Sequence, residues 1–163
     1  MRRLRAAVAA IGFGLPLSGV LAAASASEAA PTAASTAGIE LSRPWARATV
    51  TDTGVAFLSI HNAGPADRLE GVSTPVAARA GLHEMSMSNG MMEMRALPSL
   101  SIPAGATVVL SPDDRHIMLE GLNRRLRRGD NFPLKLRFQH AGVLELQVPV
   151  AGPGAEGPDG AKH

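Results

Sequence analysis

The amino-acid sequence predicts an all-β domain, built as an antiparallel sandwich or a Greek-key barrel. Apolar and polar residues alternate with a period of two in several short runs, which is the pattern of half-buried strands. Clusters rich in Gly, Pro, Asn and Asp separate these runs and indicate turns. No long segment carries the 3.6-residue apolar period of an amphipathic helix. Many short strands with regular turns favour these two architectures.

Residues 1–26 have the three parts of a signal peptide. A basic start, MRRLR, precedes the apolar run AAVAAIGFGLPLSGVLAAA, and ASA at 24–26 supplies small residues for cleavage. A transmembrane anchor is the alternative, but Pro and Gly interrupt a run that is barely long enough to span a bilayer. No cysteine follows the run, so it offers no lipid attachment site. Residues 27–38 are small and contain a proline, as in a flexible linker.

The predicted domain covers residues 39–150, which is enough chain for one modest core. Strands are expected at VAFLSIHN (55–62) and at ATVVL (106–110). Strict alternation in PLKLRFQ (133–139) and in VLELQVPV (143–150), with a short HAG turn between them, predicts a terminal hairpin. Residues 151–163 are rich in Gly and Pro and are expected to form a flexible tail.

One stretch, HEMSMSNGMMEM at 83–94, holds five of the seven methionines of the chain. Asn89-Gly90 within it is a strong hairpin signal, because both positions of a type I′ turn need a positive φ. Strand alternation then gathers His83 and four methionines on one face of the hairpin. The expected cross-strand pairs are Met85 with Met94 and Met87 with Met92.

A second cluster follows in SPDDRHIMLEGL, where His116 and Met118 are two residues apart and share a face if this segment is a strand. Thioether sulfur is a soft, neutral donor that suits Cu(I), and imidazole also binds copper. Hard cations such as Ca²⁺ prefer oxygen ligands, and structural zinc commonly uses thiolates, which a chain without cysteine cannot supply. The residue types therefore favour a Cu(I) site.

Two other interpretations of the methionines stay open from the residues alone. Methionine is a common gap-filler in hydrophobic cores, and a histidine beside it can be an ordinary polar residue. A methionine-rich surface can also adapt to a protein partner. Clustering, and alternation with Ser and Glu, argue against the first of these.

The spacing His83, ten residues, Met94, twenty-one residues, His116, one residue, Met118 resembles the H-x10-M-x21-H-x-M pattern of the periplasmic copper chaperones called PCu(A)C. Further stretches resemble the same family across residues 39–150: PWARAT, DRLEGVSTPVA, GLHEMSM, MEMR, SIPAGATVVL, HIMLEGL and RRGDNFPLKLRF. Three features depart from the family pattern. Met91 replaces a common valine, Asp113-Asp114 replaces a frequent Gly-Gly and predicts an altered turn, and the tail offers only His163 toward a second copper.

The resemblance implies a cupredoxin-like Greek-key β-sandwich that binds one Cu(I) through His83, Met94, His116 and Met118. It implies a periplasmic metallochaperone that carries copper for the assembly of cytochrome c oxidase. The implied partners are the copper-bearing oxidase subunit or a Sco-type assembly protein. Met85 and Met87 would be auxiliary donors on the same face. Copper sequestration for resistance would use the same site and is the alternative role.

Composition excludes several other classes. Without the leader, 13 basic residues stand against 14 acidic ones, so the high isoelectric point gives no reason to expect nucleic-acid binding. A blue-copper electron carrier needs a cysteine thiolate, which is absent. No Ser-His-Asp or paired-carboxylate arrangement indicates an enzyme. We expect an exported monomer that has no membrane anchor after cleavage.

The remaining candidate residues have ordinary structural interpretations, and two of them also have a functional alternative. His61 is expected to be structural, and His140 is expected to lie solvated in the HAG turn. Trp45, the only tryptophan, is expected in the core, although it could also shield a metal. Four arginines in RRLRR (124–128) form either a solvated turn or a docking patch for an acidic partner.

Overall fold

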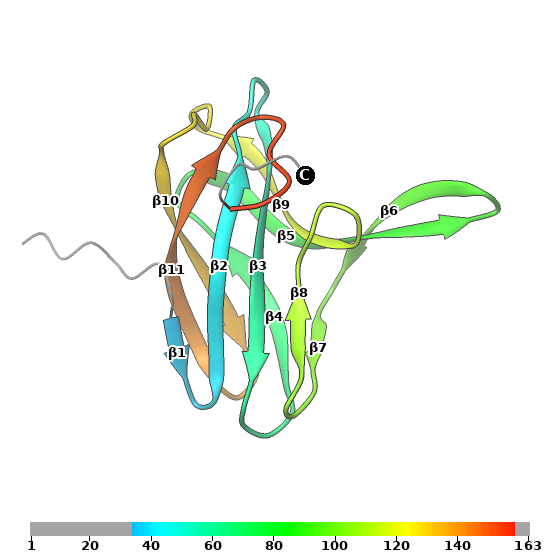
Figure 1. The fold of residues 1–163 in the computed structure, drawn as a ribbon, viewed down its shortest axis with the longest axis vertical. Coiled ribbons are helices and arrows are strands. Elements are labelled where there is room, and N and C mark those ends of the chain that lie inside the picture. The colour runs from blue at the N-terminus through cyan, green and yellow to red at the C-terminus, as the bar shows by residue number, and fades with distance from the viewer. Residues whose placement is uncertain (1–33, 159–163) are drawn as a thin grey trace, which may run out of the picture.

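The computed structural model describes residues 34–158, which form eleven strands and no helix within that range (Figure 1). The bounds are β1 Ala34–Thr36, β2 Ile39–Arg47, β3 Thr53–Asn62, β4 Asp67–Ser73, β5 Ala77–Ser88, β6 Met91–Leu97, β7 Leu100–Ile102, β8 Thr107–Val109, β9 Arg115–Leu122, β10 Asn131–Phe138 and β11 Gly142–Ala151. The expected all-β fold is confirmed.

The strands form two layers that are joined at one edge. One layer has the order β6-β5-β9-β3-β2, with β1 paired to β2 and β8 paired to β3. The other layer has the order β11-β10-β4-β7. The end of β11 pairs in parallel with β2 and so connects the layers. Neighbours that are far apart in sequence, such as β5 and β9, show that the chain crosses between layers as in a Greek-key sandwich.

Alternating side chains fill the space between the layers. In the hairpin of β10 and β11, residues such as Leu134, Leu136 and Leu146 are fully buried, while Lys135 and Glu145 face outward and form an ion pair at 3.4 Å. Burial of each such side chain stabilises the fold by about 1.5–3 kcal/mol. Among residues 34–158, no methionine belongs to the buried core.

The structure gives specific contacts within parts of the expected linker and of the expected tail. Within the expected linker, Ala37 and Gly38 have positive φ (47° and 84°) and turn β1 back onto β2. Within the expected tail, Ala155 is buried and its carbonyl accepts a hydrogen bond from Nε of Arg47 at 2.8 Å. Small-residue composition predicts flexibility, but it carries no information about strand pairing or hydrogen bonds to distant side chains.

The predicted signal peptide at 1–26, the first part of the linker and His163 lie outside the described residues. Between residues 34 and 158 there is no helix of the length and apolarity needed to cross a membrane.

Candidate metal centre

The outer part of the β5–β6 hairpin, residues 85–94, projects from the sandwich and is called the arm below (Figure 1). Its turn residues Asn89 and Gly90 have φ of 50° and 78°, as the type I′ turn requires. The register is the one that the sequence predicts, with Met85 opposite Met94 and Met87 opposite Met92. Pairing of β5 with β9 ends at Glu84, so the arm is a two-stranded ribbon.

At the base of the arm, His83 on β5 lies directly opposite His116 on β9. The two rings are stacked, with centroids 6.2 Å apart and planes inclined by 16°. The Nδ1 atoms of both rings are buried, and neither has a hydrogen-bond partner among the described residues. Burial, and then the neighbouring His83, lower the pKa of His116, which keeps its ring neutral at pH 7. A buried nitrogen lone pair without a donor is a group that a metal ion could satisfy.

The two predicted thioether ligands approach this pair from different strands. Met118 is two residues beyond His116 on β9 and lies opposite Gly81, so it shares the histidine face. Met94 belongs to β6, where it is 49% exposed and diagonal to His83. The topology therefore gathers the four predicted residues on one face of three adjacent strands, while Met94 reaches that face from the arm.

All four residues are neutral donors when the histidines are unprotonated. Within residues 34–158, no group of three or more His, Cys, Asp or Glu side chains could hold a metal ion by itself. A centre at the His83–His116 pair therefore needs the thioethers to complete its ligands. This donor set suits Cu(I) and suits Zn²⁺ or Ca²⁺ poorly.

A buried aromatic group backs the histidines. The rings of Phe57 and His116 have centroids 6.4 Å apart, and the ring of Phe57 packs against Trp45 with centroids 4.4 Å apart and planes inclined by 34°. The guanidinium of Arg47 lies 5.9 Å and 5.7 Å from the Trp45 and Phe57 ring centroids. Trp45 is 5% exposed, as expected for a core residue, and its contact with His116 runs through Phe57.

The opposite face of β5 and β9 carries an ion pair that the sequence interpretation missed. Arg115 contacts Glu84 at 3.1 Å, directly across the strands, and Asp114 at 3.5 Å. The Asp114 carbonyl also accepts a hydrogen bond from the backbone N–H of Met85 at 2.9 Å. The acidic turn before His116 therefore ties β9 to the base of the arm. Each partner is a sequence neighbour of a predicted ligand, but only the strand register shows that they meet.

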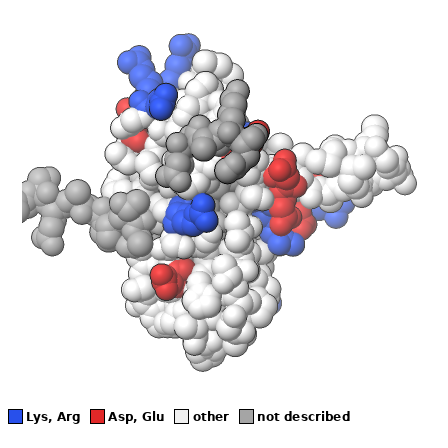
Figure 2. Space-filling view, viewed as in Figure 1, with Lys and Arg blue, Asp and Glu red and all other residues white. Residues whose placement is uncertain are grey.

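The other residues singled out from the sequence lie away from this pair. His61 is hydrogen-bonded to Thr107 at 2.9 Å, and His140 is exposed in the β10–β11 turn. In the arginine turn, Arg124 pairs with Asp130 at 2.8 Å. This turn joins β9 to β10 at the upper end of the view, whereas the arm leaves the sandwich at the side (Figures 1 and 2).

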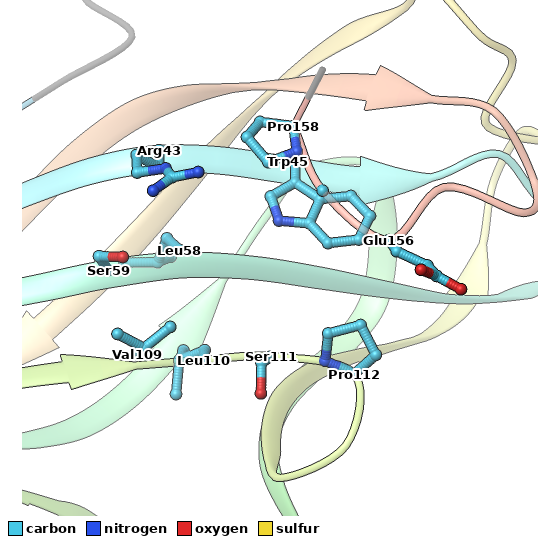
Figure 3. Close-up of a pocket in the computed structure, with 11 residues that line it drawn as sticks. Arg43, Trp45, Leu58, Ser59, Val109, Leu110, Ser111, Pro112, Glu156 and Pro158 are labelled. Atoms are coloured by element: carbon cyan, nitrogen blue, oxygen red, sulfur yellow. The ribbon is translucent and has the colours of Figure 1, made fainter. Parts of the chain in front are cut away.

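A cavity of about 210 Å³ lies beside Trp45, between β2, β3, the segment after β8 and residues 156–158 (Figure 3). Arg43, which has a φ of 49° at a bulge of β2, lines it together with Ser59 and Ser111. None of the four predicted copper ligands lines this cavity. The candidate metal centre is instead a site on the surface of the sheet, at the foot of the arm.

Comparison with known proteins connects this fold to named relatives. The family described as "Putative lipoprotein LpqE-like" matches residues 39–150. The chain belongs to the LpqE-like family. A similar protein of this kind, "Putative lipoprotein Lxx21020" from Leifsonia xyli subsp. xyli (strain CTCB07), is 35% identical over 115 residues, which cover 69% of each chain.

Solved structures similar to this LpqE-like chain include PCuAC domains and the protein DR1885. The copper-bound PCuAC domain from PmoF2 has a TM-score of 0.64 at 20% identity and covers 74% of this chain and 98% of that one. The Cu(I) form of DR1885 from Deinococcus radiodurans has a TM-score of 0.59 at 27% identity, with coverage of 76% and 83%. The cupredoxin-like sandwich expected from the resemblance is confirmed.

Proposed function

We propose that this LpqE-like protein is a copper chaperone that binds one Cu(I) through His83, Met94, His116 and Met118. The observation that carries the proposal is the stacked His83–His116 pair, with two buried ring nitrogens that lack partners within the described residues. The thioethers of Met118 and Met94 are on the same face. The likeness to the copper-bound PCuAC domain from PmoF2 and to the Cu(I) form of DR1885 supports copper as the cargo.

The arrangement favours a carrier rather than a catalyst. A site with two imidazoles and two thioethers has no anionic ligand, and Cu(II) prefers nitrogen and oxygen donors in tetragonal geometry. The ligands come from an exposed arm and the surface of a sheet, so an acceptor could replace them one at a time without releasing a free ion. We therefore propose transfer of Cu(I) without redox chemistry.

We further propose that the chain works outside the cytoplasm, in the periplasm, and delivers copper for cytochrome c oxidase assembly, to the copper-bearing subunit or to a Sco-type protein. Export is supported by the leader pattern of residues 1–26 and by the lipoprotein name of the relative. None of the 163 residues is a cysteine, so none can carry a thioether-linked lipid. A site that uses no thiol also suits an oxidising compartment.

The test is an anaerobic titration of the domain with Cu(I) against a chromophoric competitor, followed by X-ray absorption. One tight equivalent with mixed nitrogen and sulfur scattering is expected, and nitrogen or oxygen scattering alone would refute the site. The loaded domain is then mixed with an apo oxidase copper domain. Transfer supports delivery, whereas retention of copper under conditions in which the acceptor binds free Cu(I) favours sequestration.

A further inference from the structure

We infer that the arm carries a second, weaker Cu(I) site at its tip, formed by the thioethers of Met87 and Met92, from which the ion passes to the inner centre. The inference rests on the proposed function, because the tip would load the same site. It assigns a role to methionines that the four-ligand centre does not use.

The register places the two side chains within reach of one ion. Met87 on β5 and Met92 on β6 are directly opposite each other, next to the turn. Side chains in such pairs start from Cβ atoms about 4.5–5.5 Å apart. Methionine is unbranched and has three rotatable bonds beyond its backbone, so both sulfur atoms can turn toward a common point.

Exposure decreases from the tip toward the base of the same face. At the tip, Met87 is 66% exposed and Met92 is 58% exposed. In the next pair toward the base, Met85 is half-buried and Met94 is 49% exposed. His116, at the base, is 5% exposed. Successive pairs on one face of a strand are about 7 Å apart, because each residue advances the chain by about 3.3 Å. Thioethers therefore line a continuous path from solvent to the histidines.

Packing does not explain this arrangement. No methionine in the described part of the chain lies in the buried core, and the arm has no strand paired to it beyond its own two. The reverse face of the arm carries Ser86, Ser88, Glu93 and a single methionine, Met91, so cross-strand methionine pairs occur only on the other face. Figure 2 shows charged atoms at the foot of the arm and few near its tip.

The chemistry of the path requires only exchange of neutral ligands. A sulfur lone pair of the next methionine donates to Cu(I) as the bond from the previous one breaks. The ion keeps its oxidation state and charge, and no proton or electron is transferred. Two thioethers bind more weakly than a set that includes two imidazoles, so the ion moves inward down the affinity gradient.

The test compares Met87→Leu/Met92→Leu with the wild type in the absence of any partner. Leucine keeps the apolar area and volume but removes the sulfur donors. Met91→Leu is the matched control, because Met91 is 66% exposed beside the turn but lies on the reverse face, opposite Ser88. Cu(I) uptake from a chromophoric complex is followed by stopped flow, and Ag(I), as a redox-inert analogue, is followed by NMR of methionine methyl groups.

In the wild type, a second equivalent of Ag(I) is expected to shift the methyl signals of Met87 and Met92 after the first has shifted those of Met94 and Met118. In the double variant, the affinity of the tight site is unchanged, the second equivalent no longer binds, and uptake slows by about tenfold. This factor is a modest share of the enhancement that a tethered second site can give. Met91→Leu behaves as the wild type.

Equal uptake rates in the double variant and the wild type would overturn the inference, as would an equal loss in Met91→Leu. Either result, with the tight equivalent intact, leaves the proposed function standing and removes the Met87–Met92 pair as a separate copper site. If the wild type binds no tight Cu(I), the proposed function itself fails.

Discussion

Replacing His116 with leucine should leave the copper-free domain at least as stable as the wild type at pH 7 and should abolish Cu(I) binding. The ring is 5% exposed, and its Nδ1 has no partner within the described residues. A buried polar group without a hydrogen bond costs about 1–3 kcal/mol. Losing the aromatic contact with Phe57 offsets about 0.5–1.5 kcal/mol of the gain. The net expectation is a free energy of unfolding that is unchanged or higher by up to about 2 kcal/mol.

The assay is urea unfolding of both proteins, with and without Cu(I), under anaerobic conditions. At free Cu(I) 100-fold above its dissociation constant, the wild type should gain about 2.7 kcal/mol, whereas the variant should gain nothing. His61→Leu is the matched control, because His61 is hydrogen-bonded to Thr107 away from the site and should keep the full copper-dependent gain.

The pH dependence of the copper-free proteins gives a second readout. Burial and the neighbouring His83 lower the pKa of His116, so the unfolded chain takes up a proton at higher pH than the folded one. The contribution of the neutral His116 ring to wild-type stability is therefore fully present above about pH 6.5, and it is lost as the pH falls through the lower folded pKa. His116→Leu should lack this contribution.

Two results would refute the reasoning. A copper-free variant that is destabilised by about 2 kcal/mol or more would make His116 an ordinary packed core residue. A variant that keeps the copper-dependent gain in stability would remove His116 from the ligand set.

Three further predictions follow from other contacts. Met118→Leu should change the free energy of unfolding by less than about 1.5 kcal/mol. In a competition titration it should weaken Cu(I) binding by more than about 10- to 100-fold, which is the effect of losing a residue that only supports a metal ligand. The carboxylate of Asp67 accepts hydrogen bonds from the backbone N–H groups of Arg68, His140 and Ala141 at 2.7, 3.0 and 2.9 Å. Burial raises the pKa of this carboxyl, but the three hydrogen bonds outweigh that effect and the pKa is lowered overall. Asp67→Asn should therefore lose about 2–4 kcal/mol at pH 7, and the loss should shrink below about pH 3.9 as the wild-type carboxylate is protonated; an equal loss in urea unfolding at pH 7 and pH 3 would contradict this. Reversing Arg125 and Arg127 should slow transfer to an acidic acceptor at low salt and leave Cu(I) affinity unchanged, and equal transfer rates would return the turn to a solvated loop.

The arm was predictable because its information is local. The Asn89-Gly90 turn fixes the hairpin register, and alternation then fixes which methionines share a face. The terminal hairpin was predictable for the same reason, since strict alternation around a short turn leaves one possible buried face.

The meeting of His83 with His116 was not predictable from local pattern. These residues are far apart in sequence, and alternation does not say which strands become neighbours or in what register. The spacing resemblance named them as ligands, whereas the structure places them side by side. The Glu84–Arg115 ion pair stayed hidden for the same reason, although each partner adjoins a predicted ligand.

The location of the methionines has a consequence for oxidative damage. Conversion of a thioether to a sulfoxide removes a soft donor and makes the side chain polar. In most proteins such a lesion also disrupts a core, but here the methionines of residues 34–158 lie outside the buried core, and those of the arm are largely exposed. Peroxide should therefore abolish copper binding and transfer while the sandwich stays folded. A sulfoxide reductase could then restore the thioether donors without refolding the chain.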